Sequence, residues 1–200
     1  MARIRWGFPS LCIIAACALA GGQAAAEEAR SSTAAAAAAT SSYANEDKDF
    51  GVSPVSRPKR APYHAPTPVQ IPGATVIQTV ELKHLIDTNP QVVIIDVLTT
   101  RNPAPSRATI PGAVWLPRAG DGDFFAAEKE RFAAVLHKLT AGETGRPLVF
   151  LCLNSECWLS YNASLHAIEA GYTNVLWYRG GSDAWAAAGY DMRGMQATSW

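Results

Sequence analysis

A cysteine at the end of an apolar run is the residue of this chain best suited to covalent chemistry. The run Leu148–Leu151 predicts a buried strand, Cys152 follows it directly, and a short loop leads to a helix that begins near Trp158. Loop amides and the N-terminal end of a helix carry partial positive charge, which stabilises a thiolate and lowers the pKa of the thiol. A buried cysteine that closes a core strand explains the same stretch without chemistry. The pattern therefore marks Cys152 as a candidate nucleophile only.

A second cysteine, Cys157, lies five positions further on, and once a predicted export signal is removed these two are the cysteines that remain. An even number of cysteines in an oxidising compartment favours a disulfide. The spacing around a tight loop is compatible with the Cα separation of about 4.4–6.8 Å that a disulfide needs. Three interpretations stay open: a static disulfide that pins the loop, a reactive pair in which Cys152 attacks and Cys157 resolves the product, and an unpaired Cys152.

Apolar runs and helical stripes alternate along residues 63–200, and these elements must position the two cysteines. Thr79 and Ser182 are expected to cap two of the helices, and Asp96 follows a continuous apolar run. The alternation predicts an α/β domain with a five-stranded parallel sheet and helices on both faces, with sites at the carboxyl ends of strands. Asp96 is expected to accept backbone hydrogen bonds there, without reacting itself. The strands are predicted near 74–77, 92–97, 148–151 and 174–178, with a further short strand that follows a turn within 110–117, and the longer helices near 79–88, 125–139 and 158–172.

The chain before this domain divides into two parts. Residues 1–26 combine Arg3 and Arg5, an apolar run at 11–20 and an A-x-A site at 24–26, which is typical of an export signal and too short to span a bilayer. A bacterial lipobox ending at Cys17 is the competing interpretation, and it implies a lipid anchor at that residue. Both predict a domain exported to the periplasm. Residues 27–62 are rich in Ala, Ser and Pro and predict a disordered linker, which leaves 63–200 as the folded domain.

Composition argues against several functions. Lys and Arg balance Asp and Glu, 17 against 17, and the one tight basic group is Arg57, Lys59 and Arg60, so no nucleic-acid partner is predicted. The four histidines lie far apart and the sequence holds no C-x-x-C or HExxH motif, so no metal site is predicted. Since Gly-rich phosphate loops and haem-attachment motifs are missing as well, no cofactor is predicted.

Taken together, these pieces resemble a rhodanese-like domain. The stretches that carry the resemblance are 94–97, 108–113, 148–152, 170–175 and Gly180-Gly181 followed by Trp185. More narrowly, 157–163 and Trp177-Tyr178 look like the exported group of this family named for a CxxCW motif. That group is associated with oxidation of alcohols that depends on pyrroloquinoline quinone (PQQ).

The resemblance implies a fold, a chemistry and a set of site residues. In rhodaneses a cysteine after the fourth strand attacks a sulfane sulfur and holds it as a persulfide in a cradle of loop amides. Cys152 takes that place, which implies a sulfurtransferase or a thiol–disulfide exchange protein whose partner is a sulfur donor or acceptor protein or a small thiol. A periplasmic PQQ-dependent dehydrogenase and cytochrome c system is the implied setting, with PQQ not bound by this chain. The remaining site residues are Cys157 as resolving partner, the loop residues Leu153, Asn154, Ser155, Glu156 and Trp158, and Asp96 and Asn162 as supports.

The sequence also departs from the family pattern. Cys157 stands where active members usually carry an arginine, and Glu156 precedes it, so a carboxylate opposes thiolate formation and repels thiosulfate. Thr109 replaces a histidine before the Ile-Pro-Gly-Ala turn, and no arginine follows Asp96 two residues on. Poor activity with thiosulfate is therefore expected. The rival function is a non-catalytic binding module with a structural Cys152–Cys157 disulfide.

Overall fold

The computed structural model describes residues 42–99 and 106–200 of the chain. The predicted export signal, the alternative lipid anchor at Cys17 and residues 27–41 of the predicted linker lie outside these ranges. Within them, no helix is both long and apolar enough to cross a bilayer.

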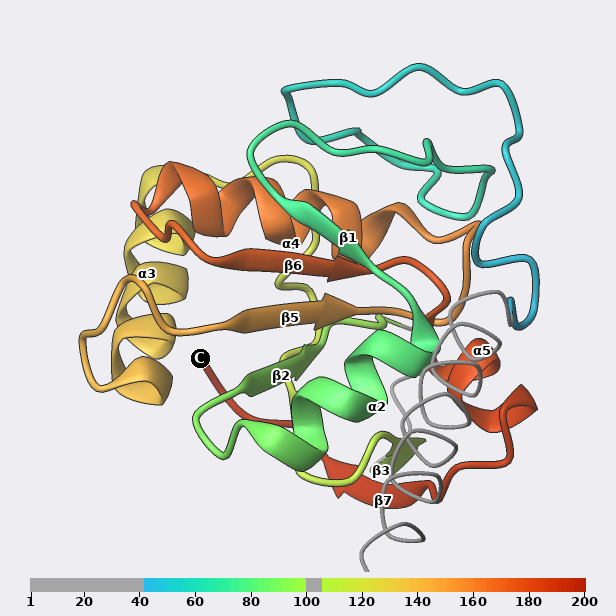
Figure 1. Ribbon diagram of the computed structural model, residues 1–200. Helices are drawn as coiled ribbons and strands as arrows, with labels where there is room; N and C mark the ends of the chain where they lie inside the picture. Colours follow the sequence, from blue (N-terminus) through green and yellow to red (C-terminus); the bar gives the residue numbers. More distant parts are fainter. Residues whose placement is uncertain (1–41, 100–105) are drawn as a thin grey trace, which may run out of the picture. The chain divides into compact units, whose positions relative to one another are not determined.

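A parallel sheet of five strands forms the centre of the domain, as predicted (Figure 1). The order across the sheet is β1-β6-β5-β2-β4, so β5 has a partner on each side. Leu151 at the end of β5 lies in register with Asp96 of β2 and Tyr178 of β6. The residues that follow these strands therefore leave the sheet at one edge. The strands are β1 (Thr75–Ile77), β2 (Val93–Asp96), β4 (Val114–Trp115), β5 (Leu148–Leu151) and β6 (Val175–Tyr178).

Helices cover both faces of the sheet, which explains why β2 and β5 are buried at every position and do not alternate between buried and exposed residues. Phe132 of α3 and Ala163 of α4 pack with Phe150 on one face. Leu82 of α2 and Trp185 of α5 pack with Val149 on the other. The helices are α2 (Thr79–Thr88), α3 (Ala126–Thr140), α4 (Trp158–Glu169) and α5 (Gly181–Ala187).

The two predicted helix caps are wrong in detail. Gln78 occupies the N-cap of α2, and Ser182 lies inside α5, which begins at Gly181. Both hydroxyls are committed to tertiary bonds, because Thr79 donates to the carboxylate of Glu46 (2.6 Å) and Ser182 accepts from Arg107 (2.8 Å). The two hydroxyls that the local sequence predicted as helix caps therefore bond to residues far away in the sequence.

A small antiparallel pair was missed by the sequence interpretation. Strand β3 (Ser106–Thr109) pairs with β7 (Arg193–Gln196) near the C-terminus. Both strands are short and largely exposed, and they lie too far apart in sequence to give a hairpin signal. The pair places Arg107 beside the carboxyl end of β2.

The packed part of the chain begins earlier than residue 63. Residues 42–72, called here the N-terminal segment, run along β1 and α4 (Figure 1). Val55 exchanges two hydrogen bonds with the hydroxyl of Tyr161 (2.9 and 2.7 Å), and the amide of Lys59 donates to Asn162 (2.8 Å). Composition predicted a disordered linker to residue 62. Composition could not predict these contacts, because the segment contributes only backbone amides and carbonyls to them. Almost any residue offers these groups.

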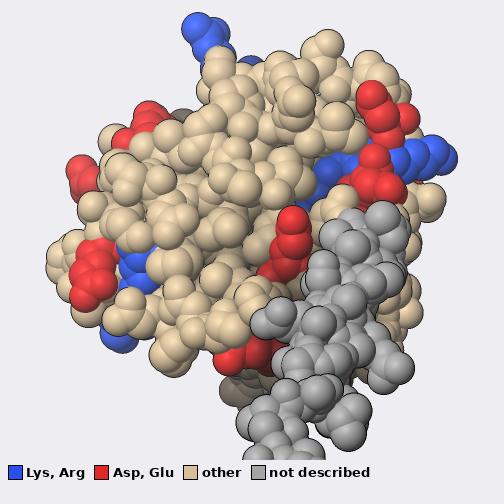
Figure 2. All heavy atoms as spheres, viewed as in Figure 1, with Lys and Arg blue, Asp and Glu red and all other residues tan. Residues whose placement is uncertain are grey.

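Charged side chains of both signs are interspersed on the face drawn in Figure 2. Lys and Arg lie beside Asp and Glu there, in keeping with a formal net charge of zero. The described residues on this face therefore form no extended area of one charge sign.

Candidate functional site

Cys152 and Cys157 form a disulfide, with their Cα atoms 6.2 Å apart. Cys152 comes directly after β5, and Cys157 is the N-cap residue of α4. The order of strand, cysteine, loop and helix inferred from the sequence is therefore present. Of the three interpretations of the cysteines, the unpaired Cys152 does not describe this structure.

The disulfide is closed off from solvent. The exposed fractions of Cys152 and Cys157 are 1% and 4%, and both belong to the core cluster beneath α3 and α4. Attack on a sulfane sulfur, which the resemblance implied for Cys152, needs a sulfur that another molecule can reach. In this oxidised state the structure agrees instead with the alternative of a buried cysteine that closes a core strand. The physical reason is a piece of the N-terminal segment that lies over the loop.

Residues 63–67, called here the cover segment, run antiparallel to residues 155–158. His64 and Cys157 form a bridge between the two stretches. Backbone hydrogen bonds on either side of that bridge fix the register of the two stretches. The second half of the cysteine loop is therefore paired with the cover segment. These bonds join Trp158 to Tyr63 (2.9 Å), Ala65 to Glu156 (2.9 Å) and Thr67 to Ser155 (3.2 Å).

Asn154 organises the interior of the cysteine loop. Its side-chain oxygen accepts from the amide of Glu156 (3.0 Å), and its backbone oxygen accepts from the amide of Cys157 (3.1 Å). Its side-chain amide donates to Asp183 (2.9 Å). The predicted cradle of amides around the sulfur is therefore wrong for these two N–H groups, because both bond within the loop itself.

The first turn of α5 supports the base of the loop. The amide of Ser182 donates to the carbonyl of Cys152 (3.0 Å), and that of Asp183 donates to Leu153 (2.9 Å). Gly181 has φ +63°, and a Cβ there would lie 2.5 Å from the carbonyl of Leu153. A side chain at this position would displace the loop, so the close approach needs glycine.

Asp96 has the structural role that the sequence suggested. It is fully buried and accepts from the amide of Leu98 (2.9 Å) and from Nε of Arg107 (2.5 Å). Burial raises the pKa of Asp96, and the charge of Arg107 opposes that rise. Arg107 also donates to Ser182, so the acid supports the loop indirectly. No local sequence signal pointed to Arg107, which comes from the missed β3.

Two predicted site residues contact the N-terminal segment. The buried amide of Asn162 bonds to the amide and carbonyl of Lys59 (both 2.8 Å) and to the carbonyl of Gly120 (2.9 Å). As a predicted support of the site, Asn162 therefore bonds to the N-terminal segment and not to the cysteine loop, since position 162 is more than one helical turn beyond Cys157. Trp158 is buried, and its indole donates to Pro66 of the N-terminal segment (3.0 Å).

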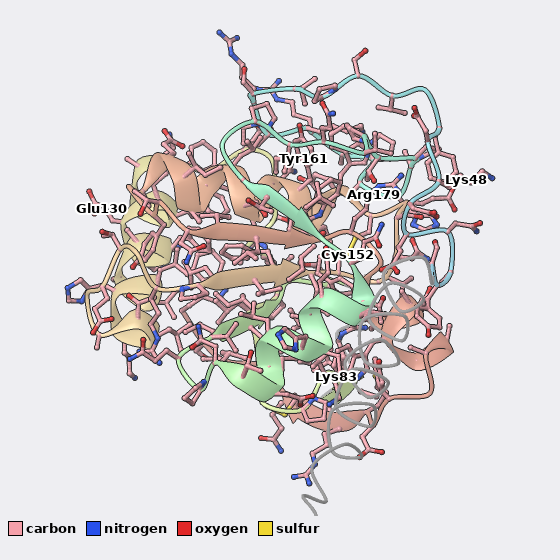
Figure 3. All side chains as sticks on the ribbon, in the orientation of Figure 1. Lys48, Lys83, Glu130, Cys152, Tyr161 and Arg179 are labelled. Atoms are coloured by element: carbon pink, nitrogen blue, oxygen red, sulfur yellow. A yellow bond between two sulfur atoms is a disulfide. The ribbon has the colours of Figure 1, made fainter. Side chains whose placement is uncertain are left out.

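Arg179 is a further residue near the loop that sequence reasoning missed. It follows β6, its exposed fraction is 1%, and it lies with Cys152 at the carboxyl edge of the sheet (Figure 3). Its guanidinium donates to Thr67, Glu46 and Lys48. A single arginine after an apolar strand does not by itself predict this role.

Two hollows border this part of the molecule. The smaller, of about 270 Å³, lies over the outside of the loop and is lined by Lys48, Phe50, Ser155, Glu156 and Asp183 among others.

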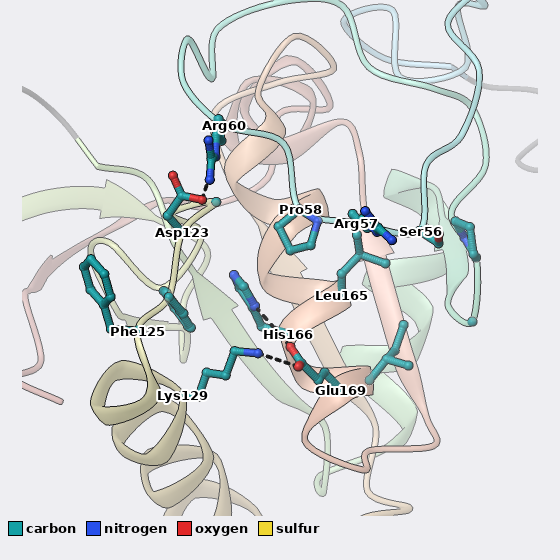
Figure 4. Close-up of a pocket in the computed structure, with 15 residues that line it drawn as sticks. Ser56, Arg57, Pro58, Arg60, Asp123, Phe125, Lys129, Leu165, His166 and Glu169 are labelled. Carbon is teal, nitrogen blue, oxygen red and sulfur yellow. Dashed lines mark hydrogen bonds and ion pairs between the residues drawn. The ribbon is translucent and has the colours of Figure 1, made fainter.

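The larger hollow, of about 1020 Å³, lies between the N-terminal segment and α4 and has no loop residue in its lining (Figure 4). Its carboxylates are already paired, Asp123 with Arg60 (2.8 Å) and Glu169 with Lys129 (2.5 Å). Among residues 42–99 and 106–200, no cluster of three or more His, Cys, Asp or Glu could hold a metal ion.

Comparison with known proteins assigns the fold to a family. The family model described as "Rhodanese-like domain" matches residues 78–188, more than half of the chain, and the chain belongs to this family. None of the curated proteins matches.

The solved structures to which the chain is similar are distant in sequence. A thiosulfate sulfurtransferase from Pseudomonas aeruginosa is 22% identical, with a TM-score of 0.46, over 62% of this chain and 21% of that chain. The Alr3790 protein from Anabaena sp. is 22% identical, with a TM-score of 0.45, over 60% of this chain and 92% of that chain. A polysulfide-sulfur transferase from Wolinella succinogenes is 19% identical, with a TM-score of 0.42, over 60% and 79% of the two chains. This chain thus spans about a fifth of the Pseudomonas protein.

Proposed function

We propose that this protein exchanges sulfur or disulfide bonds with a partner through Cys152, with Cys157 as the resolving cysteine. The observation that carries the proposal is the bond between these two residues directly after β5, where the family places its nucleophile. A bonded pair at that position is the oxidised half of a dithiol couple.

Both forms of the exchange balance. In disulfide exchange, the thiolate of reduced Cys152 attacks a partner disulfide, and one partner sulfur leaves as a thiolate. Cys157 then attacks the mixed disulfide at the Cys152 sulfur, which releases the second partner thiol and forms the Cys152–Cys157 bond. The partner disulfide is thereby reduced and the cysteine pair is oxidised, and the reverse sequence lets a partner dithiol reduce the pair. In sulfur transfer, the thiolate of reduced Cys152 attacks the sulfane sulfur of a donor, the donor's bond to that sulfur breaks, and the rest of the donor leaves with the electron pair, so that Cys152 carries a persulfide. Cys157 then attacks the Cys152 sulfur, which releases hydrosulfide and forms the disulfide again.

The charges around the loop favour a partner that is not a small anion. Glu156 and Asp183 both line the hollow outside the loop, where Lys48 is the one cation among the lining residues. Two carboxylates oppose the approach of thiosulfate, whereas a neutral thiol or a protein cysteine meets no such repulsion.

The setting of this exchange is part of the same proposal. The N-terminal pattern supports an exported, periplasmic protein, and the resemblance of 157–163 to the CxxCW group supports an accessory role in PQQ-dependent alcohol oxidation. The partner would then belong to a periplasmic dehydrogenase and cytochrome c system.

Trapping with single-cysteine variants tests the proposal. Cys157→Ser leaves Cys152 without its resolving partner, so it should accumulate covalent adducts in the periplasm of the native host, detected by mass spectrometry as mixed disulfides or a persulfide. Cys152→Ser is the matched control and should accumulate far fewer. Equal trapping by the two variants, or none by either, would refute the assignment of Cys152 as nucleophile.

One observation favours a second candidate function, a binding module in which the disulfide is static. The exposed fractions of 1% and 4% are those of a structural disulfide. In that case Cys152→Ser would leave growth on alcohols unchanged. Loss of growth with a folded Cys152→Ser protein would argue for the exchange reaction.

A further inference from the structure

We infer that Thr67 and Arg179 together hold the cover segment over the disulfide and thereby decide which thiols can reach Cys152 and Cys157. They are positioning residues, since neither is placed to react. The inference deepens the proposed function, because it concerns access to the same disulfide, but the closing of the loop can be measured without any biological partner.

Thr67 is the point at which the cover segment is fastened to the cysteine loop. Its hydroxyl donates to the carbonyl of Ser155 (2.6 Å), and its amide donates to the same oxygen (3.2 Å). The side chain is fully buried. Because buried hydrogen bonds are costly to leave unmade, the cover segment cannot lift from Ser155 without losing both bonds or admitting water.

Arg179 fastens Thr67 in turn. Its Nε donates to the Thr67 hydroxyl (3.0 Å), and Nη2 donates to the Thr67 carbonyl (3.0 Å). Thr67 therefore links Arg179 to the loop, accepting from the guanidinium and donating to Ser155.

The same guanidinium holds a second part of the N-terminal segment. Nη1 donates to the carbonyl of Glu46 (2.7 Å), and Nη2 donates to that of Lys48 (2.9 Å). The bonding partners of this buried cation are thus carbonyls and one hydroxyl, all from residues 45–67. Lifting the cover segment would strip a buried charge of partners, so we expect opening to be cooperative and infrequent.

This arrangement makes access depend on opening of the cover segment. A small reductant needs only a narrow opening, whereas a protein thiol must displace the cover segment from residues 155–158. A partner that offers an extended backbone can replace the lost hydrogen bonds as it does so. Among protein thiols, the fastening therefore favours a partner whose extended backbone replaces the hydrogen bonds of the cover segment.

The test measures the rate at which tris(2-carboxyethyl)phosphine reduces the disulfide in the full-length protein, followed by alkylation and mass spectrometry. The phosphine attacks one sulfur, the S–S bond breaks, and water converts the phosphorus adduct to the phosphine oxide, leaving two thiols. Thr67→Val keeps the shape of the side chain and removes the hydroxyl. We expect it to raise the reduction rate about tenfold, and Thr67→Ser to restore a rate near that of the unmodified protein.

A matched control separates opening of the cover segment from general destabilisation. Thr140 is also fully buried, and its hydroxyl also donates to a backbone carbonyl, that of Leu136 (3.0 Å), on α3. Thr140→Val should lower overall stability without raising the reduction rate under native conditions. Arg179→Met removes the guanidinium that holds Thr67, so it should also loosen the cover segment. It should accelerate reduction of the disulfide at least as much as Thr67→Val.

The inference is overturned if the disulfide is reduced no faster in Thr67→Val and Arg179→Met than in Thr140→Val. It is also overturned if the reduction rate of Thr67→Ser equals that of Thr67→Val. These results are independent of the trapping experiment. If the variants are reduced faster but no partner is trapped, the role of the cover segment stands and the exchange function is refuted. If a partner is trapped but the variants are not reduced faster, the exchange function stands and the role of the cover segment is refuted.

Discussion

The Nε atom of Arg107 lies 2.5 Å from Oδ2 of Asp96, and this ion pair joins strand β3 of the small antiparallel pair to the end of β2. The exposed fractions of the two side chains are 12% and 0%. Removing one member of a buried pair leaves an uncompensated charge, so we expect Arg107→Met to lower the free energy of unfolding by about 3–5 kcal/mol. Urea unfolding followed by circular dichroism measures this.

The control for Arg107 comes from the partner strand. Arg193 lies on β7 and is exposed, so Arg193→Met should change the free energy of unfolding by no more than about 0.5 kcal/mol. Equal effects of the two substitutions would show that the Asp96–Arg107 pair does not hold β3 to the sheet.

His166 predicts a pH dependence of stability. Its Nε2 lies 2.8 Å from the carbonyl of Asp121, and burial lowers its pKa below the ordinary value of 6.5, although Glu169 and Asp121 oppose that shift. As the pH falls below 6.5, the unfolded chain therefore binds a proton at this position before the folded protein does. The folded state loses stability over this interval, at up to about 1.4 kcal/mol per pH unit.

The comparison with His166→Gln isolates this contribution. Glutamine can keep the donor to Asp121 but does not titrate, so the variant should lose less stability than the unmodified protein between pH 7 and pH 5. Chemical denaturation at each pH gives the two curves. A constant difference between them across the interval would contradict the assigned pKa shift.

Glu156 is expected to limit activity with anionic sulfur donors. It lines the hollow outside the loop, so replacing its carboxylate with a guanidinium changes repulsion of thiosulfate into attraction. For the reduced protein we expect Glu156→Arg to raise kcat/KM for thiosulfate about tenfold, which corresponds to about 1.4 kcal/mol. Formation of thiocyanate from thiosulfate and cyanide provides the assay.

The matched substitution for this experiment is Glu130→Arg on α3. Glu130 projects from α3, well away from Cys152 (Figure 3), so the same change in net charge should leave kcat/KM unaltered there. A similar gain from both variants would assign the effect to overall charge, and no gain from Glu156→Arg would remove our explanation for poor activity with thiosulfate.

The parts of the site that sequence reasoning found are those that local pattern encodes. The apolar run of β5, Cys152 directly after it and the helical spacing from Trp158 onward lie within one short stretch, and the same order appears in the structure. Asp96 could be placed near the site because parallel strands end at one edge of a sheet.

The parts that sequence reasoning missed depend on long-range contacts. Arg107 reaches Asp96 from β3, and Arg179 reaches Thr67 across more than a hundred residues of chain. The covering of the disulfide comes from backbone hydrogen bonds of residues 63–67 and from the Thr67 hydroxyl, contacts that no local pattern predicts. The sequence therefore left a buried Cys152 and a reactive Cys152 as alternatives.

The reduction potential of the Cys152–Cys157 pair tests the central claim most directly. Equilibrating the purified protein with buffers of defined redox potential, and counting alkylated thiols by mass spectrometry, gives this value. A pair that exchanges with partners should have a potential above about −300 mV, within the range of exchange proteins. A value well below about −300 mV would contradict the proposed exchange and identify the disulfide as a structural crosslink.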